Sequence, residues 1–431
     1  MSRNSFCGSQ DHAMSRRRFL GATTTAAATM AGVGVFGDRA LAQALKQKDK
    51  RVIMLWLAGG ASQLETWDPK PGRPTGGPFF DTATSVPGVR ISELMPLVAA
   101  RLHRHTALIR SLNTENGDHG GGSVLMMRGR KNEPNLEYPD LGSILAHELG
   151  QADSQVPDYV SIYSQTEGRN FSKIGPGFLG SRYAPVQLTD RMGLENVTRP
   201  GSISELDHHQ RADLRSLWSQ RFARGRENEA VGSHATAYGR VAGLMASDRL
   251  FDVSREPQRV RDRYGPTQFG EHALIARRLI EAGVPFVRVA RAWWDSHSQN
   301  FESHQELVPE LDRVMSTLLD DLGERGLLDH TLVITTAEFG RTPQINPSLG
   351  RDHFATAWSS TLSGVGVNPG AVYGKTDADG QRVADGEVGA GEFFATIFQA
   401  LGIDHEHELY VGARPIPLVN PGIEPIREVL A

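Results

Sequence analysis

The chain carries one unbroken apolar run early in its length, Val52-Ile53-Met54-Leu55-Trp56-Leu57, which stops at Ala58-Gly59-Gly60. Six consecutive apolar residues indicate a strand that is buried on both faces, as strands of a parallel sheet are. The glycines that follow are typical of a loop at the carboxyl end of such a strand. We therefore predict that residues 52–57 form the first core strand of an α/β domain.

Strand-like and helix-like segments alternate through most of the remaining chain. Apolar runs predict strands over residues 106–112, 156–163, 284–289 and 331–336. Helical spacing of apolar residues predicts helices over residues 91–102, 140–149, 269–282, 307–322 and 393–401. This order predicts a doubly wound, mostly parallel sheet with helices on both faces. The polar, helical pattern over 204–250 predicts a helical insertion rather than a separate domain.

Composition narrows the classes of ligand and chemistry. The 431 residues include 46 Lys and Arg against 50 Asp and Glu, so the chain lacks the basic excess that nucleic-acid binding requires. We expect a small-molecule or carbohydrate-like ligand and no nucleic acid. The single cysteine, Cys7, excludes disulfides, thiolate-bound zinc and a thiol nucleophile. Any metal or catalytic chemistry must therefore use oxygen and nitrogen atoms.

The N-terminus reads as an export signal. Ser15-Arg16-Arg17-Arg18-Phe19-Leu20 precedes a weakly apolar stretch over residues 21–36, and Ala40-Leu41-Ala42 supplies a small-x-small cleavage site. We predict a twin-arginine signal peptide over residues 1–42, a domain over 43–431, and a location in the periplasm or cell envelope. The apolar stretch is too short and mild for a stable membrane span after processing. A basic tail before an Ala-rich helix is the alternative.

Side chains that bind metals collect after the predicted strands. The relevant segments are Gly59–Asp68, Asn116–Ser123, Trp294–His297, and Glu338–Pro343 with Gly350–His353 a few residues on. Ligands of open α/β sheets gather at the carboxyl ends of strands, so these segments should meet at one edge. The candidate metal ligands there are Asp295, His297, Glu338, Asp352 and His353.

Imidazole and carboxylate groups suit zinc, manganese or iron. We expect a divalent ion, zinc or manganese, with calcium as an alternative. Each feature also has a plainer interpretation: Asp295 and His297 fit a surface turn, and Glu338 fits a helix cap or an ion pair with Arg341.

Five segments also carry a family resemblance: Leu57–Gln63, Trp67–Lys70, Trp294–His297, Glu338–Pro343 and Gly350–His353. Together they resemble the DUF1501 proteins, an exported family that is grouped with the alkaline phosphatase superfamily, which includes sulfatases and phosphomutases. The resemblance covers nearly all of the chain after the signal. It implies an alkaline phosphatase-like core with a metal centre at the carboxyl edge of the sheet.

The resemblance also shows departures from the superfamily pattern. Ser62 stands where a metal-binding Asp ends the first strand, with Asp68 as a substitute. Leu125–Arg130 is similar to a sulfatase segment, and counting back from it places His119 at the position of the nucleophile. Glu338 and Phe339 fall where the superfamily has Asp-His, so one ligand is kept as Glu and the other is lost.

We therefore hypothesise an exported metal-dependent hydrolase of phosphate or sulfate esters, small-molecule or glycan, with metal-bound water as the nucleophile. His119 would be a metal ligand or a general acid/base, and Arg341 would clamp the anion. Ser62, expected to be exposed after the glycine turn, is a second candidate nucleophile. The alternative is a non-catalytic envelope protein of the same fold that binds carbohydrate or a protein partner.

Overall fold

The computed structural model describes residues 49–151, 154, 156–163, 175–188, 201–224, 243 and 248–431. The predicted signal peptide over 1–42 lies outside the described residues, as does most of 225–247 of the predicted insertion. Among the described residues, every helix is too short or too polar to cross a membrane.

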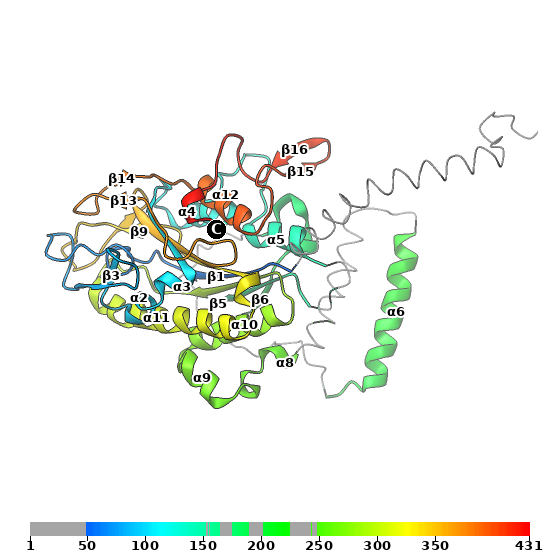
Figure 1. Cartoon of the computed structure of the whole chain (residues 1–431). Coiled ribbons are helices and arrows are strands. Elements are labelled where there is room, and N and C mark those ends of the chain that lie inside the picture. The colour runs from blue at the N-terminus through cyan, green and yellow to red at the C-terminus, as the bar shows by residue number, and fades with distance from the viewer. Residues whose placement is uncertain are drawn as a thin grey trace, which may run out of the picture. The chain divides into compact units, whose positions relative to one another are not determined.

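A central sheet organises the described part of the chain (Figure 1). Its strands are β1 (Arg51–Leu57), β4 (Thr106–Leu112), β5 (Tyr159–Tyr163), β6 (Val186–Leu188), β7 (Phe286–Arg291), β8 (Thr331–Thr336), β11 (Trp358–Gly364) and β12 (Val372–Tyr373). They lie in the order β12-β4-β11-β8-β1-β7-β5-β6. Strand β1 pairs in parallel with β7 and β8, and β11 is antiparallel to both of its neighbours. The sheet is therefore mostly parallel, as predicted.

The apolar run over 52–57 forms the centre of this sheet because it can be buried on every side. Leu55 lies between Val289 of β7 and Thr335 of β8, and Val52 to Leu55 have no exposed surface. Strands β4 and β8 have the predicted bounds. Strand β5 lies within the predicted range 156–163, and β7 begins and ends two residues after the predicted range 284–289. Strand β11 was not predicted, because Trp358–Gly364 contains serines and a threonine in place of a continuous apolar run.

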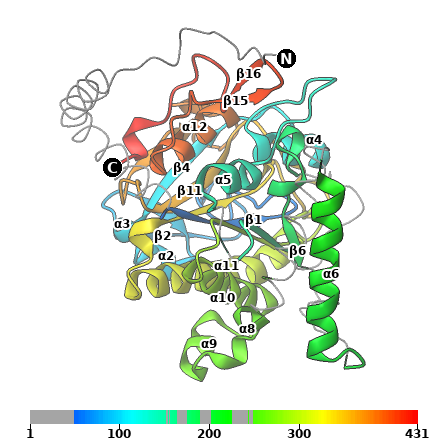
Figure 2. The same cartoon turned by 90° about the vertical axis from the view of Figure 1, so that its right-hand side faces the viewer.

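Helices cover both faces of the sheet. The described helices are α2 (Pro96–Ala99), α3 (Leu102–His105), α4 (His119–Arg128), α5 (Leu141–Leu149), α6 (Glu205–Ala223), α8 (Asp248–Phe251), α9 (Gln258–Tyr264), α10 (Gln268–Glu281), α11 (Asn300–Glu324) and α12 (Ala390–Ala400). Of these, α6 has no buried residue and does not cover the sheet. In Figures 1 and 2, α10 and α11 lie on one face, whereas α5 and α12 lie on the other. The doubly wound arrangement is therefore confirmed.

One helix prediction differs from the structure. Residues 91–102 do not form one helix, because Ile91 belongs to the hairpin of β2 (Asp81–Ala83) and β3 (Arg90–Ser92) and pairs with Thr82. The helix α2 begins only at Pro96, whose fixed φ favours a first turn. In the predicted insertion, α6 is present, with Ser204 as its N-cap and with no buried residue.

Short two-stranded sheets complete the described elements. Besides β2 and β3, they pair β9 (Gly340–Arg341) with β10 (His353–Phe354), β13 (Lys375–Thr376) with β14 (Val383–Asp385), and β15 (Glu408–Val411) with β16 (Arg414–Pro417). The pairing of β9 with β10 sets Arg341 opposite His353. This contact brings two of the candidate segments together.

Candidate metal centre

Three histidines and one aspartate meet at the carboxyl edge of the sheet. His119 begins α4 just after β4, and Asp295 and His297 follow β7. His353 lies in β10, which leads into the antiparallel strand β11 at this same edge. Because β4, β7 and β8 run in one direction, the segments that follow them converge although they are far apart in sequence.

Each imidazole is fixed through its Nδ1 atom. His119 Nδ1 lies 2.9 Å from Glu338 Oε1, and His297 Nδ1 lies 2.7 Å from Asp352 Oδ1. His353 Nδ1 lies 2.7 Å from the carbonyl oxygen of Gly117. A hydrogen on Nδ1 satisfies all three acceptors and leaves the lone pair of the neutral ring on Nε2.

The Nε2 atoms turn toward the carboxylate of Asp295. His119 Nε2 is 3.3 Å from Oδ2, while His297 Nε2 and His353 Nε2 are 3.1 and 3.3 Å from Oδ1. The Nε2 atoms of His297 and His353 are 3.0 Å apart. One donor atom from each of His119, Asp295 and His353 fits within a mutual distance of 4.8 Å. Ligands about 2.0–2.1 Å from one ion are separated by roughly 2.9–3.4 Å, so these spacings fit a shared cation.

The contact between His297 and His353 needs a positive charge between the two rings. Two neutral imidazoles that both carry hydrogen on Nδ1 would point lone pairs at each other across 3.0 Å. A proton or a metal ion relieves that repulsion. The donor set therefore fits a divalent ion: His119, Asp295 and His353 are the residues whose atoms would hold it, and His297 Nε2 lies beside them.

Protonation of the centre follows from its charges. Burial opposes a charge on His119, but hydrogen bonds and charges from Asp295 and Glu338 outweigh it and raise the pKa of His119 to about 9. Burial likewise opposes ionisation of Asp295, yet His119, His353 and Arg341 hold the pKa of its carboxyl far below the usual range. A metal must therefore displace a proton from His119 at neutral pH.

Glu338 orients the ring of His119 through a hydrogen bond. Its side chain is fully buried, and Oε1 accepts hydrogen bonds from His119 Nδ1 and from the backbone N–H of Gly59 at 2.8 Å. This is the carboxylate–histidine arrangement that orients imidazoles in metal sites. Oε2 has no hydrogen-bond partner among the described residues and is the one oxygen of Glu338 left for an ion.

Phe339 packs against two of the histidine rings. Its centroid lies 5.0 Å from that of His119 and 4.5 Å from that of His353. Asp352, in contrast, is an exposed anchor of His297. The sequence-predicted candidates thus lie together: Asp295, His119, His297 and His353 have donor atoms turned toward one another, and Glu338 and Asp352 anchor two of the rings.

The structure gives Arg341 a different place from the expected anion clamp. Its side chain is fully buried, and its nitrogens donate to the carbonyl oxygens of Gly59, Gly60 and Arg351 and to Asp295 Oδ1. These bonds occupy each guanidinium nitrogen with protein oxygens. Arg341 therefore positions Asp295 and does not face an open substrate site.

The expected exposure of Ser62 is wrong. Ser62 has no exposed surface, its backbone N–H donates to His304 Nε2 at 3.1 Å, and its hydroxyl accepts the N–H of Leu64 at 3.3 Å. The two-glycine turn folds inward against the sheet, so the side chain is buried. Asp68, the suggested substitute ligand, instead forms an ion pair with Lys70 at 2.9 Å.

Several supporting residues were not identified from the sequence. The Gly117 carbonyl holds His353, and a Cβ on Gly350 would lie 1.9 Å from the carbonyl oxygen of His297. Glu65 and Arg351 form a fully buried ion pair at 2.8 Å. Backbone carbonyls leave no side-chain signal, whereas the glycine within Gly350–His353 is a signal that could have indicated a close approach.

The fold and the cluster define an α/β protein with a candidate divalent-metal centre at the carboxyl edge of its sheet. The chain belongs to the DUF1501 family, described as "Protein of unknown function", whose model matches residues 49–430. The comparison with curated proteins gives no match.

Solved structures show distant likenesses. The PsFucS1 sulfatase from Pseudoalteromonas sp. is 12% identical, with 82% of this chain and 68% of that chain covered and a TM-score of 0.39. The phosphonate monoester hydrolase of Agrobacterium radiobacter is 12% identical, with 88% and 77% covered and a TM-score of 0.35. A magnesium-bound TAB5 alkaline phosphatase variant is 11% identical, with 82% and 98% covered and a TM-score of 0.37. Likeness at this level defines neither an activity nor a substrate for this chain.

Proposed function

We propose that this protein is a metal-dependent hydrolase of phosphate or sulfate esters. The observation that carries the proposal is the cluster itself: three imidazoles fixed through Nδ1 present Nε2 atoms around one carboxylate. A divalent cation held there would polarise the ester and lower the pKa of a bound water toward neutrality. Zinc and manganese suit this nitrogen and oxygen donor set.

The protein's own groups would keep this centre ready. Arg341, His119 and His353 hold Asp295 ionised, and Glu338 and Asp352 orient the rings of His119 and His297. His297 has 47% of its side chain exposed. A bulky ester can therefore reach the centre, and solvent supplies the attacking water and the proton that the departing alcohol takes up.

A second candidate function is a non-catalytic protein of this fold that binds carbohydrate or a protein partner. The observation that favours it is that His119 stands where a side-chain nucleophile is expected, and that Ser62 is fully buried, with Glu65 hydrogen-bonded to its hydroxyl. The two functions differ in whether an ester is hydrolysed, so one experiment separates them.

The test measures metal content and hydrolysis together. Elemental analysis after purification without chelators should find about one or two equivalents of a transition metal. The metal-loaded protein should hydrolyse members of a panel of phosphate and sulfate esters, and His353→Ala should lower the rate by at least 100-fold. His209→Ala, an exposed histidine on α6, is the matched control.

Two outcomes would contradict the proposal. Less than a tenth of an equivalent of metal, with no thermal shift on adding zinc or manganese, rules out the centre. A loaded protein that binds glycans but hydrolyses no ester supports the non-catalytic function.

We also propose export by the twin-arginine route to the periplasm or cell envelope. Ser15-Arg16-Arg17-Arg18-Phe19-Leu20 and the site Ala40-Leu41-Ala42 support it. Replacing Arg16 and Arg17 by Lys should leave uncleaved protein inside the cell, detected by fractionation and N-terminal sequencing. Unchanged export of this variant would contradict the route.

A further inference from the structure

An exposed tryptophan stands beside the metal centre. Along residues 292–297, buried and exposed residues alternate, with Trp293, Asp295 and His297 exposed and the residues between them buried. Trp293, which is 57% exposed, thus presents an aromatic side chain to solvent two residues before Asp295.

The backbone of Trp293 is strained. Its φ is 72°, in the left-handed region that bulky residues rarely adopt. In the part of the chain that the structure describes, four non-glycine residues have positive φ: Glu115, Trp293, Gln299 and Leu349. Each lies within four positions of His119, Asp295, His297 or Asp352. Strain gathered around one site, and away from the rest of the fold, points to a role there.

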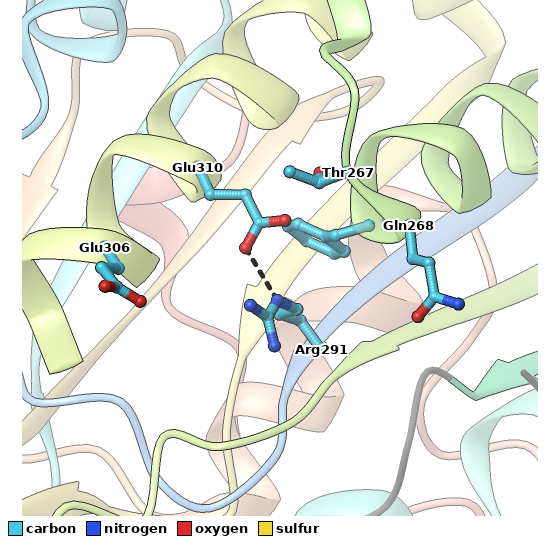
Figure 3. Close-up of a pocket in the computed structure, with 6 residues that line it drawn as sticks. Thr267, Gln268, Arg291, Glu306 and Glu310 are labelled. Carbon is cyan, nitrogen blue, oxygen red and sulfur yellow. Dashed lines mark hydrogen bonds and ion pairs between the residues drawn. The ribbon is translucent and has the colours of Figure 1, made fainter.

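Hydrogen bonds on both sides of Trp293 hold this conformation. Ala58 donates its N–H to the carbonyl oxygen of Arg291 at 2.9 Å, and its own carbonyl accepts the N–H of Trp294 at 3.2 Å. Figure 3 shows the guanidinium of Arg291 paired with Glu310, at 2.7 Å, in a pocket of about 320 Å³. Arg291 is thus neutralised and anchors the strand end that leads into Trp293.

A second exposed apolar side chain lies on the facing loop. Leu349 is 56% exposed, and its carbonyl oxygen accepts the N–H of Asn300 at 3.0 Å, which ties this loop to the start of α11. The polar residues Gln299 and Asp352 are also exposed. The rim of the centre therefore combines apolar surface with groups that bind hydroxyls.

We propose that Trp293, together with Leu349, forms a platform on which the sugar ring of a sulfated or phosphorylated glycan packs while its ester reaches the centre. A pyranose has an apolar C–H face that suits an indole and hydroxyls that suit the Gln299 amide and the Asp352 carboxylate. An aryl ester would use only the apolar part of this rim. The inference rests on the proposed function, and it adds that the alcohol part of the ester is a sugar.

The test compares ring and non-ring esters of the same charge. Glucose 6-sulfate and glucose 6-phosphate are paired with ethyl sulfate and ethyl phosphate, and kcat/KM is measured with the metal-loaded protein. In Trp293→Ala, kcat/KM should fall at least tenfold more for the sugar ester than for the ethyl ester. Trp293→Phe should restore most of the loss, because it keeps an aromatic face.

A glycine substitution at position 293 separates the effect of losing the indole ring from the effect of the strained backbone. Trp293→Gly accepts a φ of 72° without cost but lacks the indole, so it should behave like Trp293→Ala. If it instead matches the wild type, the backbone conformation matters and the platform is refuted. Trp218→Ala, which removes an exposed tryptophan of α6, is the matched control and should leave the ratio of sugar to ethyl ester unchanged.

Binding measured without turnover distinguishes this inference from the proposed function. Quenching of tryptophan fluorescence by glucose 6-sulfate should be lost in Trp293→Phe, while the sugar still binds. If no ester is hydrolysed but glucose 6-sulfate binds wild type at least tenfold more tightly than Trp293→Ala, the platform stands and the hydrolase fails. If esters are hydrolysed and the variants show no preference, or only 4-nitrophenyl esters depend on Trp293, the glycan platform is refuted.

Discussion

Raising the pH from 7 to 9 should strengthen metal binding at the centre about 50-fold, and about 100-fold once the plateau above pH 9 is reached. The pKa of His119 is raised to about 9 by Asp295 and Glu338, which outweigh its burial. Below that pH, the metal must displace the proton from His119, and each pH unit costs about a factor of ten. Two units correspond to about 2.7 kcal/mol, and above pH 9 the affinity should level off.

Glu338→Gln tests the origin of this profile. The carboxamide oxygen of Gln can still accept the His119 Nδ1 and Gly59 hydrogen bonds, so the variant removes mainly the charge. The pKa of His119 should fall, and the break in the profile should move to lower pH. Above pH 9, the variant should bind metal about 10- to 100-fold more weakly, because an outer carboxylate no longer supports the ligand.

The assay is competition for zinc against a chromogenic chelator at half-unit steps from pH 6.5 to 9.5. His209→Ala, on the exposed surface of α6, should follow the wild-type curve. A wild-type affinity that stays flat between pH 7 and 9 would refute the coupling to His119. A break at the same pH in Glu338→Gln would show that the Glu338 charge does not set it.

Three further outcomes follow from the structure. Gly350→Ala should lower stability by about 1–3 kcal/mol, seen as a lower Tm, and weaken metal binding, because its Cβ would lie 1.9 Å from the His297 carbonyl oxygen. His304 is buried, and burial lowers its pKa to about 4, so between pH 4 and 6.5 the folded state binds fewer protons than the unfolded state. The free energy of unfolding should therefore fall by about 3 kcal/mol as the pH drops through that window. Denaturant titrations should show this fall, and His304→Gln should make it smaller. Ser62→Ala should leave ester hydrolysis within about threefold of wild type while His353→Ala abolishes it; a covalent intermediate trapped on Ser62 would reverse this assignment.

The family and the alternating order of strands and helices could be predicted from residue patterns. The runs at 52–57, 106–112 and 331–336 became β1, β4 and β8 because continuous apolar segments can be accommodated only where a sheet is covered on both faces. Strand β11 was not predicted because its serine side chains form hydrogen bonds with hydroxyls of the neighbouring strands inside the sheet. Ser360 and Thr336, for example, share a hydrogen bond at 2.7 Å, a partner that the local sequence cannot show.

For the centre, residue patterns and the family resemblance were enough to identify His119, Asp295, His297, Glu338 and His353 as candidates that follow strands. The role of each residue became evident only from the folded arrangement. Arg341 became a buried support for Asp295, and Glu338 an anchor for Nδ1 of His119. The reason is physical: a side chain's role depends on which atom of a distant segment lies within about 3 Å of it, and chain folding sets that distance, not the neighbouring residues.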